Sequence, residues 1–209
     1  MIHSTPRLSP LLQERLLEAG TTELFLDHYK RICERSEALT KNKAYAECVK
    51  ETMEIASRAR PHPYVVLGGM GVLCYAYAEN PENVITWRGT ADIDILGHHR
   101  TLDKVVKQVG FKPVLGNTWG RNAAGTSKIW TYDKNETGHV LAQVRQDVII
   151  AGRDKTQQVY DSSIELPLYG INVKVPGPET FIAMKRDAGR SKDKVDIELL
   201  RQARAALQR

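Results

Sequence analysis

The segment Arg88–Leu96 (Arg-Gly-Thr-Ala-Asp-Ile-Asp-Ile-Leu) constrains the fold most, because it carries two carboxylates in a strand-like stretch. Alternation along a strand places Asp92 and Asp94 on one face, together with Arg88 and Thr90, and the apolar residues on the other. At about 6.6 Å apart, two carboxylates repel without a cation, yet they can converge on metal ions held about 3.5–4 Å apart, as in nucleotide transfer. The alternative is a strand end whose acids are simply solvated.

A Gly-Gly turn lies upstream of the acid pair. The apolar run Tyr64–Leu67 enters Gly68 and Gly69, and a helix is predicted from there through Tyr77. Glycines allow the backbone to approach a triphosphate closely, and a helix N-terminus offers amide groups to phosphate oxygens. Most Gly-Gly turns merely connect elements. The order strand, Gly-Gly, helix and acidic strand is a much rarer combination.

These two motifs together resemble the nucleotidyltransferase superfamily with the DNA polymerase beta-like fold. Its hallmark is Gly-Gly or Gly-Ser followed by Asp-x-Asp or Asp-x-Glu, which matches Gly68-Gly69 and Asp92-Ile93-Asp94 here. The sequence Arg-x-Thr-x-Asp-Ile-Asp after Leu-Gly-Gly is most similar to the AbiEii-type branch. That branch includes toxins of toxin–antitoxin pairs.

A third block, Val173–Leu200, strengthens the resemblance. Pro178 predicts the start of a helix that carries Lys185. AbiEii-type enzymes have a similar helix with a lysine near the phosphates, followed by an acidic motif at the start of the next helix. Lys185, Asp193 and Asp196 match this pattern. The alternative for Lys185 is a stem that packs along the helix while its ammonium group reaches water.

The family's third carboxylate is expected on a strand beside the acid pair, where it can deprotonate the attacking hydroxyl or complete a metal shell. We choose Asp147, because it interrupts an apolar strand in which an unpaired carboxylate would be costly to bury. A salt bridge to Arg145 is the structural alternative. Lesser candidates on loops or strand ends are Asp133, Asp154 and Asp161.

The resemblance implies an α/β (α+β) fold, with a mixed β-sheet nucleotidyltransferase core flanked by helices and an N-terminal helical extension. It also implies transfer of a nucleoside monophosphate from an NTP to a hydroxyl of tRNA or protein, with release of pyrophosphate. Catalysis would depend on Lys185 and on Mg²⁺ or Mn²⁺ held by Asp92, Asp94 and Asp147. The nucleotide would contact Gly68, Gly69, Arg88, Thr90, Lys185 and Asp196.

Two other functions stay open. One is an antibiotic nucleotidyltransferase that modifies a small-molecule hydroxyl, and the other is an inactive nucleotide- or RNA-binding module. AbiEii toxins tend to have a larger helical part after the catalytic half, whereas this chain has its extra length before it. That departure leaves open which acceptor is used and whether a cognate antitoxin exists, and it bears less on the chemistry.

Composition adds the expected compartment and partners. The 209-residue chain has a net charge of +5 and a pI near 9.1, which fits a polyanionic partner but also many unspecialised proteins. The scattered Cys33, Cys48 and Cys74 lack metal-ligand spacing and predict buried or half-buried thiols in a reducing compartment. Without a signal peptide or a long apolar run, we expect a cytoplasmic protein with no membrane partner.

Three segments are predicted from the order of elements. Residues 1–60 form an N-terminal helical extension, residues 61–175 the nucleotidyltransferase core, and residues 176–209 C-terminal helices packed on the core. Pro61-His62-Pro63 marks the first boundary. Basic residues of the extension are interpreted as solvated helix faces rather than a nucleic-acid surface. Within the core, helix 101–109, a hairpin turning at Tyr169-Gly170, and strands at 111–115, 128–133, 139–151 and 157–160 are expected.

Overall fold

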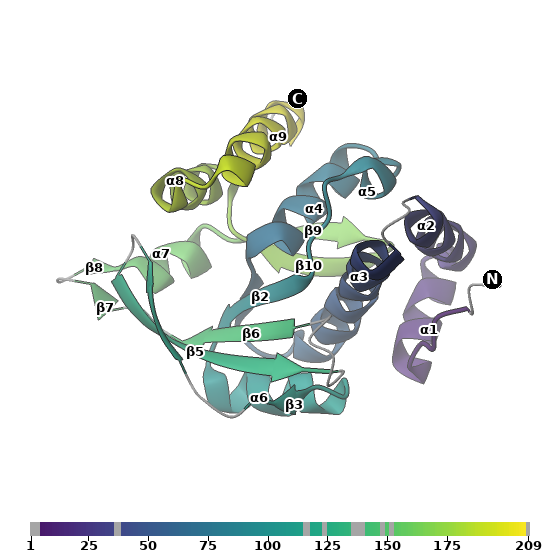
Figure 1. The fold of residues 1–209 in the computed structure, drawn as a ribbon, viewed down its shortest axis with the longest axis horizontal. Coiled ribbons are helices and arrows are strands. Elements are labelled where there is room, and N and C mark those ends of the chain that lie inside the picture. Colours follow the sequence, from purple (N-terminus) through teal and green to yellow (C-terminus); the bar gives the residue numbers. More distant parts are fainter. Residues whose placement is uncertain are drawn as a thin grey trace.

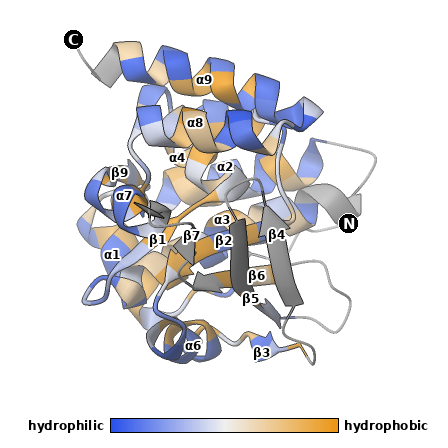
Figure 2. Ribbon diagram, turned by 90° about the vertical axis from the view of Figure 1, so that its left-hand side faces the viewer, coloured by the Kyte–Doolittle hydropathy of each residue, from blue (hydrophilic) through white to orange (hydrophobic). Residues whose placement is uncertain are grey.

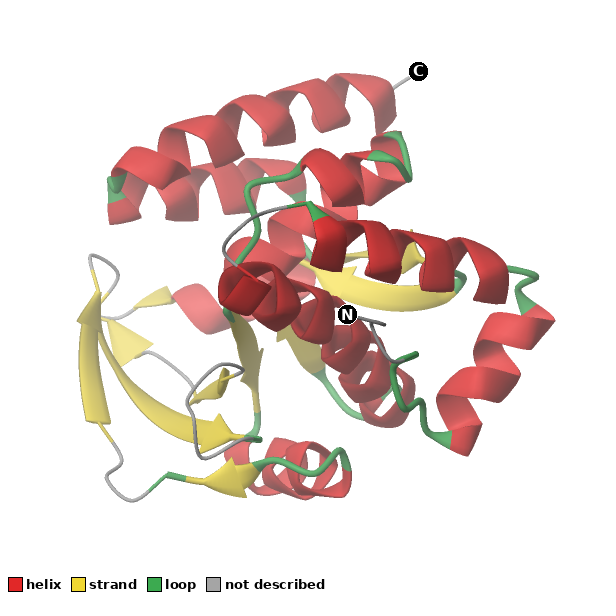
Figure 3. Ribbon diagram, turned by 45° about the vertical axis from the view of Figure 1, so that its right-hand side comes forward, coloured by secondary structure: helices red, strands yellow, loops and turns green. Residues whose placement is uncertain are grey.

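The computed structural model describes residues 5–35, 39–114, 118–122, 125–134, 141–146, 149–150 and 153–207. Three helices begin the chain, and strands and helices alternate after them (Figure 1). In Figure 3 the strands of the larger sheet gather on one side and the N-terminal helices on the other. The helices are α1 (Pro10–Glu18), α2 (Thr22–Glu34), α3 (Leu39–Ala59), α4 (Gly68–Glu79), α5 (Asn83–Thr86), α6 (His99–Gln108), α7 (Lys155–Asp161), α8 (Pro178–Ala188) and α9 (Ser191–Leu207).

The larger sheet is mixed and has the strand order β1-β2-β6-β5-β3, with β4 paired to β5. β2 runs parallel to β6 and antiparallel to β1, and β5 is antiparallel to its neighbours. A parallel pair needs a crossover connection, which α6 begins here. The mixed sheet with flanking helices, which Figure 2 shows from a second side, confirms the predicted fold class. The strands are β1 (Tyr64–Val66), β2 (Asp92–Gly97), β3 (Lys112–Pro113), β4 (Thr118–Asn122), β5 (Gly125–Asp133), β6 (Leu141–Gln146), β7 (Ile149–Ile150), β8 (Arg153–Asp154), β9 (Ile164–Leu168) and β10 (Ile171–Val175).

The hairpin of β9 and β10 holds the N-terminal helices in place. Its turn has positive φ at Tyr169 (51°) and Gly170 (78°), the conformation of a tight two-residue hairpin turn. Thr21 donates a hydrogen bond to the Tyr169 carbonyl (2.9 Å), and the buried His28 ring lies 2.8 Å from the Tyr169 hydroxyl. A Cβ atom on Gly170 would lie 2.1 Å from that of Ala19, so the end of α1 packs directly on the turn.

One continuous apolar cluster joins the N-terminal helices, the sheet and the C-terminal helices, so α1, α2 and α3 share their core with the rest of the described chain. The three cysteines are free and buried, as predicted. No helix within the described ranges has the length and apolar character needed to span a membrane. Members of the cluster from successive elements are Leu12, Phe25, Met53, Val66, Tyr75, Ile93, Val144, Val173, Phe181 and Leu200.

The predicted strand at 157–160 is wrong, because this stretch belongs to helix α7. Thr156 and Val159 are both buried while Gln157 is exposed, which is a helical spacing. Val159 packs against Val65, Leu67 and Leu96, so tertiary contacts on one face of a short helix outweigh the strand propensity of a single valine. The hairpin and the helix starting at Pro178 are confirmed.

Candidate active site

The turn between β1 and α4 brings the start of a helix against the acidic strand. The Leu67 amide donates to the Asp94 carbonyl (2.8 Å), which extends the β1–β2 pairing up to the turn. Gly68 then adopts φ +60°, and a Cβ atom there would lie 2.1 Å from Oδ2 of Asp94. Only glycine allows both this backbone conformation and this approach. The Asp94 carboxylate therefore lies directly against the N-terminus of α4.

Thr90 joins the turn to the first acid of the pair. Its hydroxyl donates to Oδ1 of Asp92 (2.5 Å), and a Cβ atom on Gly69 would lie 2.9 Å from its Cβ atom. The same Cβ atom would lie 3.0 Å from the indole of Trp87, which is buried. The second glycine is thus required because the segment before β2 packs on the first turn of α4.

Asp92 and Asp94 lie on one face of β2, and Ile93 and Ile95 are buried on the other, as the alternation predicted. The strand is shorter than expected, however, because it begins at Asp92 and not at Arg88. Gly89, at φ +76°, turns the chain out of strand geometry just before it. A folded connection, and not the strand face, therefore places Thr90 against Asp92.

The acid pair fits a divalent cation of the Mg²⁺ type. Two half-buried carboxylates on one strand face supply the oxygen donors that Mg²⁺ prefers. The glycine turn, where a Cβ would overlap Asp94, leaves backbone close enough for a metal-bound triphosphate to reach α4. Within the described residues, no group of three or more His, Cys, Asp or Glu side chains is placed to hold a metal ion. Further ligands would therefore come from the nucleotide or from other residues of the chain.

The strand register identifies what lies beside the pair. On β6, Leu141 is level with Asp92 and Gln143 is level with Asp94. On β5, Asp133 is level with Leu141 and is half-buried, so it shares the row and the face of Asp92 two strands away. Because neighbouring strands lie about 4.8 Å apart, the backbones of Asp92 and Asp133 are about 10 Å apart. Among the carboxylates whose side chains the structure describes, Asp133 is the third-acid candidate on this face.

The other candidates for the third carboxylate are placed less favourably or lie outside the described residues. Asp147 is one of the latter, so its assignment stays a prediction. Asp154 belongs to β8, which pairs with β7 apart from the larger sheet, and its side chain is not described. Asp161 is exposed at the end of α7 and accepts a hydrogen bond from Gln157 (2.7 Å).

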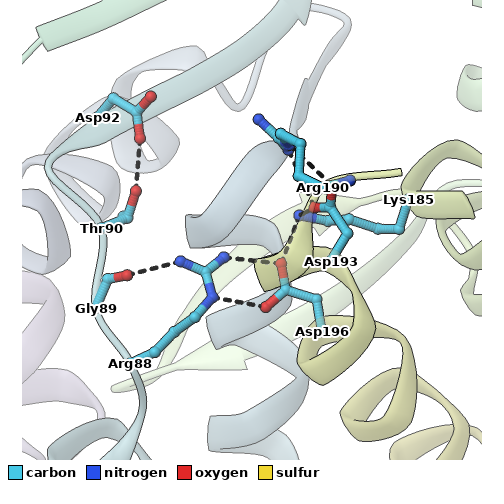
Figure 4. Close-up of polar contacts among 8 residues, drawn as sticks. All are labelled: Arg88, Gly89, Thr90, Asp92, Lys185, Arg190, Asp193 and Asp196. Carbon is cyan, nitrogen blue, oxygen red and sulfur yellow. Dashed lines mark hydrogen bonds and ion pairs between the residues drawn. The ribbon is translucent and has the colours of Figure 1, made fainter. Parts of the chain in front are cut away.

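Arg88 connects the segment before β2 to α9. Its Nε and Nη2 donate to both carboxylate oxygens of Asp196 (2.8 and 2.7 Å), and its Nη1 donates to the Gly89 carbonyl (2.9 Å; Figure 4). The guanidinium also lies 4.6 Å from the centre of the Trp87 ring. Bidentate arginine–carboxylate pairs fix geometry strongly. Arg88 thus orients the segment that leads into the acid pair.

Lys185 does not reach solvent along the surface of α8, because it is only 3% exposed. Its ammonium lies 2.7 Å from Asp196 and 3.4 Å from Asp193, both buried on α9. Burial alone would raise the pKa of Asp196, but the hydrogen bonds from Arg88 and Lys185 outweigh burial and lower it. Lys185 and Asp196 therefore hold α8, α9 and the acid-bearing segment together, and a contact of either with nucleotide stays a prediction.

Arg190, in the turn between α8 and α9, was not among the predicted site residues. Nε and Nη2 of its guanidinium pair with Asp193 at 2.8 and 3.1 Å (Figure 4). The sequence signal was present, since a basic residue three positions before an acid at a helix start predicts such a pair. Its long-range position could not be read from spacing. We call Arg88, Lys185, Arg190, Asp193 and Asp196 the α9 cluster.

Comparisons with known proteins add structural neighbours. No protein-family model and no curated protein matches the chain. Among solved structures, an antigenic nucleotidyltransferase-like protein from Paracoccidioides brasiliensis is similar over 75% of this chain and 75% of its own, at 20% identity and a TM-score of 0.44. The antibiotic-resistance factor ANT(2'')-Ia, solved in solution, is similar over 77% of this chain and 89% of its own, at 16% identity and a TM-score of 0.45. At these TM-scores neither likeness identifies a function, so the function has to be inferred from the chemistry of the site.

Proposed function

We propose that this chain is a metal-dependent nucleotidyltransferase that transfers a nucleoside monophosphate from an NTP to an acceptor hydroxyl. The observation that carries the proposal is the contact between the Asp94 carboxylate and Gly68 at the start of α4, with Asp92 on the same strand face. Phosphates favour helix N-termini, and carboxylates favour the cation that accompanies a triphosphate. The sequence resemblance to nucleotidyltransferases points to the same chemistry.

Each part of the site has a role in this reaction. Asp92 and Asp94 would hold Mg²⁺ or Mn²⁺, which supplies charge neutralisation at the phosphates when bound. The first-turn amides of α4 at Gly68 and Gly69 have no acceptor within the helix, so they are suited to phosphate oxygens. Thr90 orients Asp92 through its hydroxyl (2.5 Å). These groups act by position and charge rather than by covalent chemistry.

The step itself is an in-line displacement at the α-phosphorus. The acceptor hydroxyl oxygen forms a bond to that phosphorus while the bond to the α–β bridging oxygen breaks, and pyrophosphate leaves with the electron pair. The hydroxyl proton passes to a carboxylate. Asp133, in the row of Asp92, is suited to this role, and Asp147 is the candidate from the sequence.

For the acceptor we propose a polyanion, tRNA, with a protein hydroxyl as the second choice. The basic residues around the α8–α9 turn are exposed, and their charge matches a phosphate backbone. A toxin role with a cognate antitoxin follows from the resemblance to the AbiEii branch. An antibiotic-type acceptor, a small hydroxyl compound, is the runner-up. The basic residues in question are Arg186, Arg190, Lys192 and Lys194.

The test is transfer of α-labelled NTPs into total RNA, lysate protein and hydroxylated antibiotics in parallel. Asp92→Asn and Asp94→Asn should each lower transfer about 10³-fold or more, because each removes a ligand of the proposed metal. Glu23→Gln, which changes an exposed acid on α2, is the control and should retain the native rate. Near-native transfer by a folded Asp92 or Asp94 variant would rule out this site. Absence of transfer from every NTP to all three acceptor pools would favour the inactive binding module.

A pair of glycine variants isolates the turn from the general cost of a left-handed residue. Gly68 and Gly20 have similar φ values, +60° and +65°, but a Cβ atom on Gly20 meets nothing within 4 Å. Each alanine variant should lose about 1–2 kcal/mol of stability through backbone strain. Only Gly68→Ala should also abolish transfer, because its methyl group displaces Asp94. Equal activity of the two folded variants would contradict the role of the turn.

A further inference from the structure

The side chain of Arg190 is exposed, yet hydrogen bonds to Asp193 fix its orientation. The side chain is 54% exposed, yet Nε and Nη2 pair with Asp193 at 2.8 and 3.1 Å. The backbone amide of Arg190 donates to the same carboxylate (3.0 Å). Most exposed arginines gain little from an ion pair, because ordering the side chain offsets the attraction. Here a bidentate pair fixes the guanidinium plane, and the carboxylate that makes the pair is itself held by a backbone amide.

The group that fixes Arg190 is itself buried and charged. Asp193 is 1% exposed and also lies 3.4 Å from the ammonium of Lys185. Burying a carboxylate and an ammonium costs free energy that a simple surface arginine does not need. An exposed guanidinium oriented by a buried pair is the arrangement expected where a ligand is to be met without reorganisation.

The Arg88–Asp196 pair relates the position of Arg190 to that of Asp92. Arg88 and Asp196 hold the segment before β2 against α9. From this pair, the segment that leads forward to Asp92 and the part of α9 that leads back to Arg190 extend toward the same side (Figure 4). Arg190 lies six positions before Asp196, about 9 Å along the helix, and Asp92 lies four positions after Arg88, at most about 13 Å away. The guanidinium extends toward the side on which β2 lies.

The charges agree with that placement. The pKa of Arg190 is raised above its ordinary value, first by the hydrogen bond to Asp193, with the negative charges of Asp94 and Asp196 contributing. Asp94 therefore lies within electrostatic range of the guanidinium, although it belongs to a different part of the chain. The acid pair is faced by the start of α4 on one side and by Arg190 on another.

We propose that Arg190 binds the triphosphate of the NTP, holding its β- and γ-phosphates across from the start of α4. This inference rests on the proposed function and names the group that recognises the leaving pyrophosphate. A planar guanidinium suits phosphate oxygens better than an ammonium does, because it offers parallel N–H donors. Before nucleotide binds, the same positive charge offsets the repulsion between Asp92 and Asp94. Asp193 is the positioning residue for Arg190.

The test compares Arg190→Gln with Arg201→Gln. Arg201 is a matched control, because it lies on α9, which begins directly after Arg190, is 50% exposed and pairs with Glu198 three positions away. We expect Arg190→Gln to raise KM for the NTP about 10- to 100-fold, the effect of one charged hydrogen-bonded contact, and to change kcat less. Arg201→Gln should leave both unchanged. Equal KM values for Arg190→Gln and wild type would overturn the proposal.

Two measurements do not need turnover. In chelator, inorganic tripolyphosphate should raise the melting temperature of wild type and of Arg201→Gln, but not that of Arg190→Gln. In the absence of any phosphate, Arg190→Gln should lower the melting temperature in the wild-type background, and less so in an Asp94→Asn background. A tripolyphosphate shift that survives in Arg190→Gln would place the phosphates elsewhere.

Arg190→Lys keeps the inference testable if the glutamine variant does not fold. Lysine keeps the charge but not the planar pair with Asp193, so KM should rise less than in Arg190→Gln while tripolyphosphate still stabilises the protein. Native KM in Arg190→Lys would mean that the guanidinium is not required. If the Asp92 and Asp94 variants lose transfer while both Arg190 variants keep native KM, this inference fails and the proposed function stands. If the acid-pair variants also keep transfer, the proposed function itself is wrong.

Discussion

The molecule holds two buried charge clusters that look alike in composition and differ in what they face. The α9 cluster has three cations and two carboxylates, and its two arginines, Arg88 and Arg190, are 23% and 54% exposed. The second, which we call the α3 cluster, joins α3 to α2 and to the end of β5. It has two lysines, two glutamates and a tyrosine: Tyr29, Glu47, Lys50, Glu51 and Lys134.

The α3 cluster is closed on itself. Glu51 is fully buried and forms ion pairs with Lys50 (3.0 Å) and Lys134 (2.5 Å). Glu47 forms an ion pair with Lys50 (2.6 Å) and accepts a hydrogen bond from the Tyr29 hydroxyl (2.5 Å). Its lysine and glutamate charges cancel. Burial raises the pKa of Tyr29 and the adjacent Glu47 raises it further, so the phenol stays protonated and donates. Such a cluster can fix α3 against the sheet, but it presents no net charge to a ligand.

The α9 cluster has an excess positive charge and opens toward the site. The contrast teaches that burial of ionic groups alone does not indicate function. What distinguishes the α9 cluster is that its buried carboxylate Asp193 orients a cation, Arg190, that is 54% exposed, whereas the outer cation of the α3 cluster, Lys134, is 28% exposed. In the α3 cluster the buried carboxylate Glu51 even has one oxygen, Oε2, without a hydrogen-bond partner among the described residues. We therefore expect the α3 cluster to affect stability only.

The largest effect should come from removing the buried lysine of each cluster. Lys185→Met and Lys50→Met each remove two charged contacts at once, so each should cost about 3–5 kcal/mol of unfolding free energy. A lysine whose ammonium reached water, the alternative that the sequence left open for Lys185, would cost much less, but Lys185 is buried. Urea denaturation of both variants measures the loss.

Kinetics at a temperature where both lysine variants are folded then separate the clusters. Lys185→Met should raise KM for the NTP, because Asp193 and Asp196 no longer hold Arg190 and Arg88 in place. Lys50→Met should keep the native KM and kcat. If both variants lose activity in proportion to their folded fraction, the functional distinction between the clusters is wrong.

A smaller effect is expected at the outer cations. Arg88→Gln leaves Asp196 with Lys185, and Lys134→Met leaves Glu51 with Lys50, so each buried carboxylate keeps one partner. Each substitution should cost about 1.5–3 kcal/mol, the range for hydrogen bonds to charged groups. Arg88→Gln should also lower transfer, since the segment before Asp92 loses its tie to α9. Lys134→Met, which leaves Asp133 unchanged, should retain native transfer. A loss of transfer in this variant would mean that Lys134 also positions Asp133.

The sequence predicted what local rules determine. The same-face acids of β2, the glycine turn, Pro178 at the start of α8 and the turn at Tyr169-Gly170 all follow from period, φ and capping preferences. It did not predict the partner of Arg88, because Asp196 is 108 positions away and no periodicity encodes such a pair. The burial of Lys185 was missed for the same reason. The helix at α7 was missed because burial of Val159 against β1 and β2 decides its structure.

The smallest effect should appear in the acid dependence of stability. Burial alone would raise the pKa of Asp193, but hydrogen bonds from Arg190 and the charge of Lys185 outweigh burial and lower it from 3.8 to about 2. A carboxyl whose pKa is lower in the folded state contributes stability that is fully present above its unfolded pKa. This contribution is lost as the pH falls through the folded pKa, here from about pH 4 to about pH 2.

Arg190→Gln removes guanidinium donors that lower the pKa of Asp193, so it separates the acid-labile stability of the α9 cluster from that of the α3 cluster. The difference in unfolding free energy between wild type and Arg190→Gln should be constant above about pH 5 and should shrink as the pH falls toward about 2. Burial raises the pKa of Glu47 in the α3 cluster and Lys50 lowers it, with a net lowering, so wild type keeps an acid-labile contribution that Arg190→Gln does not remove. Urea denaturation at pH 6, 4, 3 and about 2, with Arg201→Gln as the control, measures both contributions. A difference that stays constant to about pH 2 would mean that Arg190 does not control the Asp193 carboxyl, and that the α9 cluster is as closed as the α3 cluster.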